Sequence, residues 1–191
     1  MDKPQIEAFD TLPELPLPVY ASHTIGSMRM SDGTALSVVF GLSKEMAEAL
    51  KAHALDDTDE ELQKNTSDRA RFGTGSYEDW YAKDRYPFAL VTDTGALAAL
   101  IWLGPQAFPG EEAGEWDTMA FRSYVPYRGK GIMTPFGRFA IQTYLALKPG
   151  HRIWLETDAT NAAAIGLYEK LGFVSRGYRD GTERLLMTSE A

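Results

Sequence analysis

Short apolar runs separated by turn residues fill much of the first half of the chain. Residues 23–30 and 34–41 flank Ser31-Asp32-Gly33, and an Asp-Gly step suits the positive φ of a tight hairpin turn. Residues 88–92 and 96–103 form a second pair of apolar runs, joined around another Gly-containing turn. The pattern predicts two hairpins of antiparallel strands.

Between these hairpins the spacing of apolar residues changes to that of a helix. In residues 44–55 apolar side chains recur every three or four positions, and Ser43 can cap the helix. Capping-box patterns, Thr58 with Glu61 and Ser76 with Asp79, follow. We therefore expect the connection to the second hairpin to be helical in several short pieces.

The second half of the chain alternates strand and helix patterns. A strand over residues 115–125, a glycine-rich turn and a helix over residues 134–147 are followed by a strand at 152–157, a helix at 162–171 and a last strand pair around Asp180-Gly181. Alternation of this kind implies crossover connections and at least one parallel pair of strands. The fold class is therefore mixed α/β.

The N-terminal stretch differs in composition from the rest. Residues 1–19 carry Pro4, Pro13, Pro16 and Pro18, which disfavour a helix and a central strand. We expect an extended arm over residues 1–19, followed by one domain over residues 20–191.

Composition narrows the possible functions. The 191 residues include no cysteine, which excludes disulfides, a cysteine nucleophile and thiolate metal sites. The net charge of −8 opposes general nucleic-acid binding. We find no apolar window long enough to span a membrane and no signal-peptide pattern, so we expect a cytoplasmic protein, a monomer or a homodimer. The three histidines lack ligand-like spacing, so no metal site is predicted.

The turn Arg128-Gly129-Lys130-Gly131 is the clearest chemical signal. It lies between a strand and a helix, where backbone N–H groups at a helix N-terminus can bind an anion. The spacing is neither that of a P-loop nor that of a dinucleotide-binding turn. Four basic residues nearby offer a patch for a polyphosphate: Arg122, Arg128, Lys130 and Arg138.

A second segment, Asn161 to Phe173, gives this turn a context. It runs from an Asn through Leu167-Tyr168 to Leu171-Gly172-Phe173. Together with the turn, it resembles the acetyl-CoA-dependent N-acetyltransferases of the GNAT superfamily. The nucleotide motif of that family, Gln/Arg-x-x-Gly-x-Gly/Ala, is matched at Arg128 and Gly131 and departs at Met133.

The resemblance implies a fold, a co-substrate and a set of binding residues. The fold would be a twisted, mostly antiparallel sheet flanked by helices and splayed where acetyl-CoA binds. Backbone groups of Phe121, Arg122 and Ser123 would bind the pantetheine arm, with an amide near Ser123 polarising the acyl carbonyl. The pyrophosphate would lie on the segment Arg128, Gly129, Lys130, Gly131, Ile132, Met133 and Thr134, and Asn161 would hydrogen-bond the cofactor.

The same resemblance implies direct acetyl transfer to an amine, without a covalent enzyme intermediate. Tyr168 would protonate the departing thiolate, although its spacing alone favours a core aromatic residue. Glu156 would be the general base, with Glu115 or ordered water as alternatives. The expected acceptor is a small-molecule or peptide amine, and the resemblance implies that residues 56–86 recognise it.

Several alternatives stay open. The acidic run from Asp56 to Glu61 is a solvated helix start or a site that attracts a cationic acceptor. The chain could also be a catalytically silent module that binds or senses CoA or acyl-CoA, or an interaction protein that binds no CoA.

Overall fold

The computed structural model of this protein describes residues 3–9, 12–110 and 112–189. The strands are β1 (Gln5–Ala8), β2 (His23–Arg29), β3 (Ala35–Phe40), β4 (Tyr86–Val91), β5 (Leu97–Pro105), β6 (Trp116–Ser123), β7 (Arg152–Asp158), β8 (Phe173–Tyr178) and β9 (Arg184–Ser189). The helices are α1 (Lys44–Leu55), α2 (Glu60–Asn65), the π-helix η1 (Arg69–Gly73), α3 (Tyr77–Tyr81), α4 (Met133–Leu147) and α5 (Ala162–Lys170). The hairpins and the alternation of strands and helices predicted from the sequence are confirmed.

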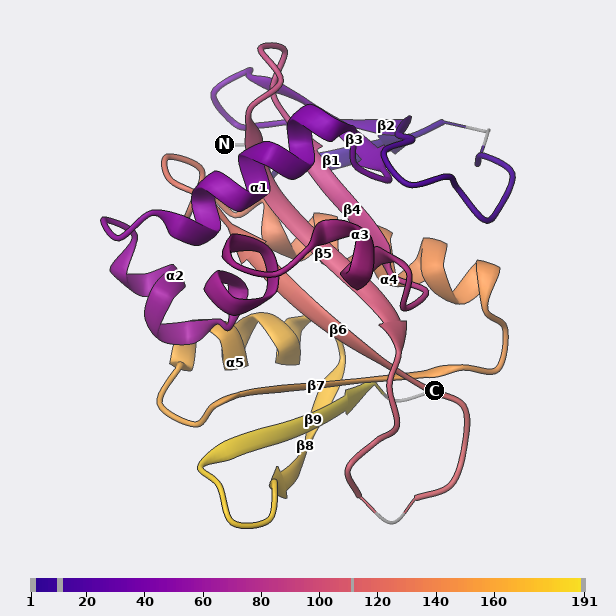
Figure 1. Ribbon diagram of the computed structural model, residues 1–191, viewed down its shortest axis with the longest axis vertical. Helices are drawn as coiled ribbons and strands as arrows, with labels where there is room; N and C mark the ends of the chain where they lie inside the picture. The colour runs from indigo at the N-terminus through magenta and orange to yellow at the C-terminus, as the bar shows by residue number, and fades with distance from the viewer. Residues whose placement is uncertain (1–2, 10–11, 111, 190–191) are drawn as a thin grey trace.

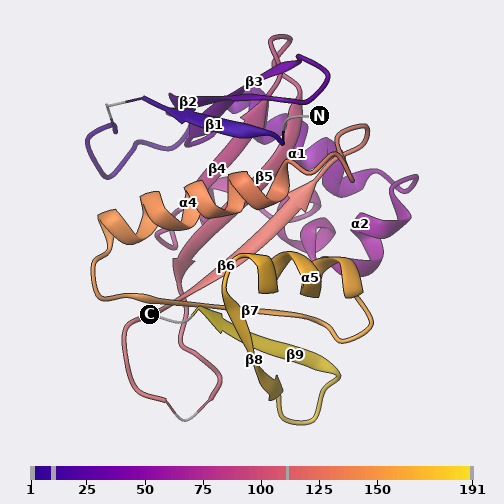
Figure 2. The ribbon, with the colours of Figure 1, turned by 180° about the vertical axis from the view of Figure 1, so that it is seen from behind.

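All the strands join in one sheet of order β1-β2-β3-β4-β5-β6-β7-β9-β8. Every neighbouring pair is antiparallel except β6 with β7, which is parallel. Helices α1, α2 and α3 cover one face (Figure 1), and α4 and α5 cover the other (Figure 2). The mixed, mostly antiparallel architecture expected from the sequence is therefore present.

The central strands β4 and β5 are buried on both faces, which explains their unbroken apolar sequences. Phe88 and Ile101 belong to the core under α4, whereas Ala89 and Leu100 belong to the core under α1 and α3. Helix α4 contributes Phe136, Ala140 and Tyr144 to the first core at a spacing of four residues. The sheet thus fixes β5 and β6 firmly in the middle of the molecule.

The helix caps agree only in part with those predicted from the sequence. The N-cap of α2 is Asp59, which accepts a hydrogen bond from the Leu62 N–H at 3.0 Å. The capping box predicted at Thr58 is wrong, because the Thr58 hydroxyl donates instead to Asp56. Ser43 and Ser76 cap α1 and α3 as predicted.

Part of the predicted arm lies in the sheet, since β1 pairs with β2 as an edge strand. Residues 1, 2, 10 and 11 of that arm, together with residues 111, 190 and 191, lie outside the described residues.

Candidate functional site

The parallel pair β6–β7 separates after a very short contact. Pairing runs only from Trp116 with Arg152 to Thr118 with Trp154, and the remaining length of both strands diverges. A cleft of about 730 Å³ opens at this point, between β6 and β7 and beneath the N-termini of α4 and α5. The predicted splay is present, and the volume of the cleft is typical of pockets that bind small molecules and cofactors.

The register of β6 decides which backbone groups face the cleft. The Tyr124 N–H donates to the Ala98 carbonyl of β5 at 3.0 Å. Because hydrogen-bonded pairs alternate in an antiparallel ladder, the amides of Phe121 and Ser123 point away from β5, toward the splay, and that of Arg122 points toward β5. Phe121 and Ser123 therefore remain candidates for backbone contact with a ligand, whereas Arg122 does not.

The glycine turn presents a row of free N–H groups. Gly129 and Gly131 have φ of 77° and 74°, a region that glycine enters at little cost. In the part of the chain that the structure describes, no acceptor is recorded for the N–H groups of Gly129, Gly131, Ile132, Met133 or Thr134. Helix α4 also has no side-chain N-cap and no acidic residue in its first turn. The arrangement is suited to an anion.

Met133 does not obstruct this row. Its side chain is half-buried and packs against the apolar core under α4, although the residue also lines the cleft. The departure from the family motif is therefore a residue that contributes to the core.

Two of the four residues in the predicted basic patch, Arg122 and Arg128, form ion pairs. The Arg122 side chain is nearly buried and pairs with Asp68. Arg128 donates to both carboxylate oxygens of Asp59, at 3.0 and 2.8 Å, and also pairs with Glu61. Lys130 is not among the residues that line the cleft, and its ammonium lies over the Tyr127 ring. Backbone groups, rather than these side chains, carry the capacity to bind an anion.

The Arg128 side chain links distant parts of the chain. Besides Asp59, the N-cap of α2, it donates to the Ser123 carbonyl at 2.9 and 3.2 Å. It thus joins α2, the end of β6 and the glycine turn, and we call this set of contacts the latch. The hydrogen bond from Arg128 lowers the pKa of Asp59. The acidic run that contains Asp59 is therefore structural at this position.

Tyr168 and Asn161 both lie in the cleft. Tyr168 is 8% exposed and its ring packs on Phe121, 5.2 Å between centroids. Burial raises the pKa of Tyr168 above its ordinary value, although nearby arginines act in the opposite direction. The described residues offer its hydroxyl no recorded hydrogen-bond partner. Asn161 caps α5, accepting from the Ala164 N–H at 3.1 Å, which leaves its NH₂ group for a ligand.

The two carboxylates considered as general bases differ in position. Glu156 on β7 lines the cleft and pairs with Arg179 at 3.2 Å and with Arg184 at 3.7 Å. Glu115 is exposed and does not line the cleft. Position therefore favours Glu156 over Glu115.

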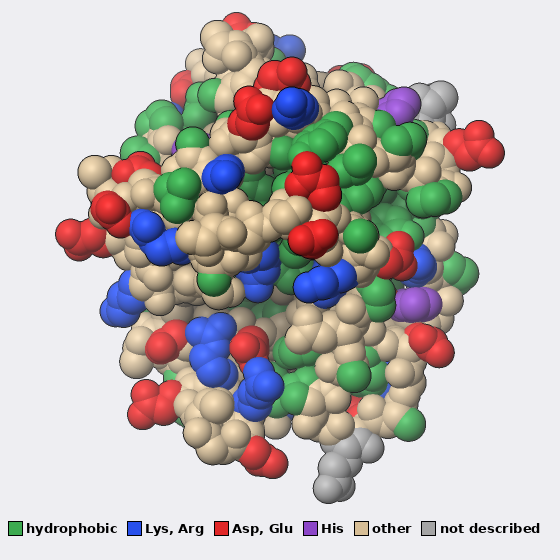
Figure 3. Space-filling view, in the orientation of Figure 1, with side chains coloured by type: hydrophobic (Ala, Val, Ile, Leu, Met, Phe, Trp, Pro, Cys, Tyr) green, Lys and Arg blue, Asp and Glu red, His purple; other side chains and the backbone are tan. Residues whose placement is uncertain are grey.

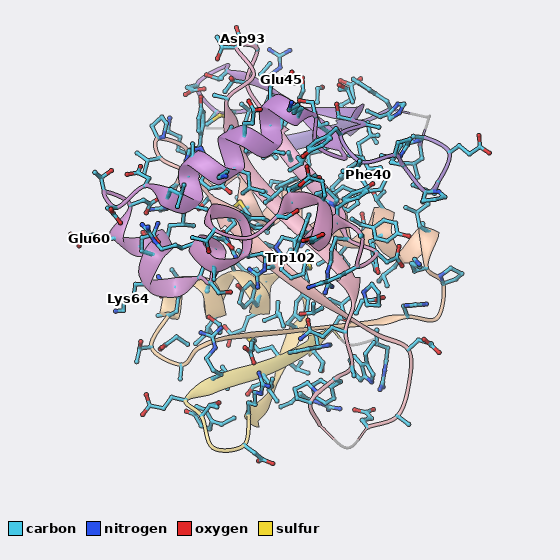
Figure 4. All side chains as sticks on the ribbon, viewed as in Figure 1. Phe40, Glu45, Glu60, Lys64, Asp93 and Trp102 are labelled. Carbon is cyan, nitrogen blue, oxygen red and sulfur yellow. The ribbon has the colours of Figure 1, made fainter. Side chains whose placement is uncertain are left out.

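Three cleft or near-cleft residues escaped the sequence reasoning. Asp68 is 1% exposed and lies between Arg122 and Arg71, and the Arg71 guanidinium lies over the Trp102 ring. Asp68 and Arg71 belong to the region assigned to acceptor recognition, whereas Trp102 lies outside it, on β5. Trp102 is close to the centre of the view in Figure 4.

Among the described residues, no group of three or more histidines and carboxylates is placed to hold a metal ion. No helix in that part of the chain has the length and apolar character needed to cross a bilayer.

Comparison with known proteins identifies the family. The family model described as "Acetyltransferase (GNAT) family" matches residues 42–173, which span the short helices, the central strands, the glycine turn and α5. The chain belongs to this family. A search of curated protein sequences gave no match.

Solved structures of acetyltransferases share the fold of this GNAT protein at low sequence identity. The GNAT domain of S. lividans PAT has a TM-score of 0.60 at 18% identity, covering 85% of this chain and 95% of that one. Mycobacterium smegmatis RimJ, solved with CoA-disulfide, gives 0.63 at 18% identity over 87% and 86% of the two chains. Spermidine N-acetyltransferase from Vibrio cholerae, solved with CoA and spermine, gives 0.59 at 16% identity over 79% and 92%.

Proposed function

We propose that this protein transfers the acetyl group of acetyl-CoA directly to a primary amine, on a small molecule or a peptide. The observation that carries the proposal is the row of N–H groups of Gly129, Gly131, Ile132, Met133 and Thr134, which have no recorded acceptor among the described residues and border the β6–β7 cleft. Family membership and the CoA complexes among related structures support the choice of CoA as the ligand.

Each part of CoA would have its own binding residues in the cleft. The N–H row at the start of α4 would hold the pyrophosphate. The amides of Phe121 and Ser123, which point into the splay, would bind the pantetheine arm and polarise the acyl carbonyl. Asn161 would donate from its NH₂ group.

Transfer requires a base that removes a proton from the amine and an acid that donates a proton to the departing thiolate. The C–N bond forms as the C–S bond breaks, through a tetrahedral intermediate. The proton of the amine passes to Glu156, directly or through water, and the Tyr168 hydroxyl protonates the departing thiolate. Because burial raises the pKa of Tyr168, the phenol is in its acid form at neutral pH.

The experiment measures release of free CoA from acetyl-CoA across a panel of amines, with Tyr168→Phe in parallel. We expect kcat to fall by about 10²-fold or more, with unchanged affinity for CoA, because the substitution removes only the hydroxyl. Tyr144→Phe is the matched control, since Tyr144 is also a buried tyrosine but lies on α4 outside the cleft lining.

The outcomes separate the competing functions. Tight CoA binding with no turnover of any amine, and no effect of Tyr168→Phe, would favour the silent CoA-binding module. Absence of CoA binding would overturn both enzyme and module.

A further inference from the structure

Two guanidinium groups share one buried carboxylate at the edge of the cleft. Asp68 accepts from Arg122 Nη2 at 2.6 Å and from Arg71 Nη1 at 3.1 Å. The Arg122 side chain is 9% exposed and that of Arg71 is 28% exposed. Burial and the charge of Arg122 lower the pKa of Arg71. The cluster therefore carries one positive charge that Asp68 does not neutralise, and an uncompensated charge in a partly buried setting is costly.

The geometry directs the excess charge toward the point where the sheet splays. The Arg71 guanidinium lies 5.2 Å from the centroid of Trp102, and both residues line the cleft. Trp102 pairs with Ala120 of β6, two residues past Thr118, the last residue of β6 that pairs with β7. Arg71 comes from the π-helix η1, on the face of the sheet opposite α4. It thus approaches the splay from the side opposite the glycine turn.

Arg71 also keeps donors for a ligand. The only hydrogen bond recorded for its guanidinium in the described chain is the one from Nη1 to Asp68, and a guanidinium has five N–H donors in a fork that matches a carboxylate. Short π-helical segments often occur at functional sites.

Basic residues also outnumber acidic residues in the lining of the cleft as a whole. In a protein of net charge −8, only two lining residues are acidic, Glu61 and Glu156, and both are ion-paired with arginines. The basic lining residues are Lys64, Arg71, Arg122, Arg128, Lys170 and Arg184. Figure 3 shows Lys and Arg side chains gathered across the middle of this face, between α2 and α3 above and β7 to β9 below. The lining thus lacks an unpaired carboxylate for a second ammonium group of a polyamine.

We propose that Arg71 binds a carboxylate of the acceptor, so that the substrate class is a primary amine that also carries a carboxylate, as a free amino acid does. The inference rests on the proposed acetyl transfer. The bound carboxylate would neutralise the excess charge of the Arg71–Asp68–Arg122 cluster and hold the amine toward the splay, where the amides of β6 face the acyl group.

The test compares amines that differ only in this group. We would measure kcat/KM with 4-aminobutyrate and 4-aminobutanamide, with free amino acids and their amides, with short peptides carrying acidic side chains, and with spermidine. We expect the carboxylates to be preferred by about tenfold or more over their amides. Arg71→Gln should abolish the preference. Arg69→Gln should retain it, because Arg69 belongs to the same π-helix and pairs with Asp57 outside the cleft.

Each outcome decides for or against the inference. Equal turnover of carboxylates and amides, a preference for spermidine, or a preference that survives Arg71→Gln would overturn it. An Arg71-dependent preference seen only with acidic peptides supports the carboxylate site and assigns its source to a peptide.

A binding measurement keeps the inference testable even if no amine is acetylated, a result that would count against the proposed function alone. Protein saturated with CoA would be titrated by calorimetry with 4-acetamidobutyrate and with its amide. Tighter binding of the carboxylate, lost in Arg71→Gln, supports the site. Equal binding of the two compounds overturns it.

Discussion

A single substitution in the glycine turn tests the anion site. Gly131 has a φ of 74° and open space around the position of a Cβ atom, so an aspartate fits sterically and places a negative charge beside the row of N–H groups. We expect Gly131→Asp to raise the Kd for CoA by about tenfold or more, because the carboxylate repels the pyrophosphate and competes for the N–H groups. Isothermal titration calorimetry measures this change.

The matched control is Gly95→Asp. Gly95 has a φ of 83° and open space, but it lies in the hairpin between β4 and β5, far along the chain from the turn. This variant carries the same backbone strain, about 1–2 kcal/mol, without a charge at the cleft. Similar losses of CoA affinity in the two variants would show that strain, not anion binding, explains the effect.

At the scale of elements, the latch from α2 to the glycine turn can be released selectively. Asp59→Asn keeps the ability to cap α2 and removes the charge that pairs with Arg128. We expect the free energy of unfolding in urea to fall by about 1–3 kcal/mol, since the Asp59 side chain is only 10% exposed and the loss of its charge leaves Arg128 paired only with the more exposed Glu61.

The comparison variant for the latch is Asp57→Asn, in the same acidic run but 88% exposed. An exposed pair of this kind contributes about 0–1 kcal/mol. The Arg128 contact lowers the pKa of Asp59, so its stabilisation is present above the ordinary pKa of 3.8 and is lost as the pH falls through the lower, folded value. Equal effects of the two substitutions would argue against the latch. So would an Asp59→Asn variant whose free energy of unfolding depends on acid pH in the same way as that of the unaltered protein.

Helices and strands could be predicted where they depend on residues that are close together in the sequence. Helix α1 follows from Ser43 and the apolar spacing after it, and the hairpins follow from their Gly-containing turns. The residues of the glycine turn could be named for the same reason. The partners of Arg128 and Arg122 could not, because Asp59 and Asp68 lie 69 and 54 residues away in sequence, and no local pattern encodes which arginine meets which aspartate. Arg71 was missed because its place over Trp102 depends on the packing of η1 against the sheet.

For the whole molecule, the buried tyrosines predict a loss of stability in alkali. Burial raises the pKa values of Tyr77, Tyr124, Tyr144 and Tyr168 above the ordinary value of 10.0. A group with a raised folded pKa stabilises fully below its unfolded pKa, and this stabilisation is lost as the pH rises toward the folded value. We expect the free energy of unfolding to fall above pH 10, by about 1.4 kcal/mol per pH unit for each tyrosine.

Urea unfolding at several pH values between 8 and 11 measures this slope. Tyr144→Phe removes one of the four hydroxyls. The free energy of unfolding of this variant should therefore fall less steeply with pH, by the contribution of one tyrosine. A stability that stays constant through this range would contradict the burial of these phenols.

The shortness of the β6–β7 pairing has a consequence for how the chain folds. From β1 to β6 each strand pairs with its neighbour in sequence, so this part can form through local contacts that close early. Strands β7 to β9 join it in the sheet through three residue pairs, after the chain has passed through α4. A ligand seated in the splay contacts both sides of that narrow junction and binds only when they are together. Such a ligand would therefore raise the cooperativity of unfolding, and the ligand-free protein would open first along this line.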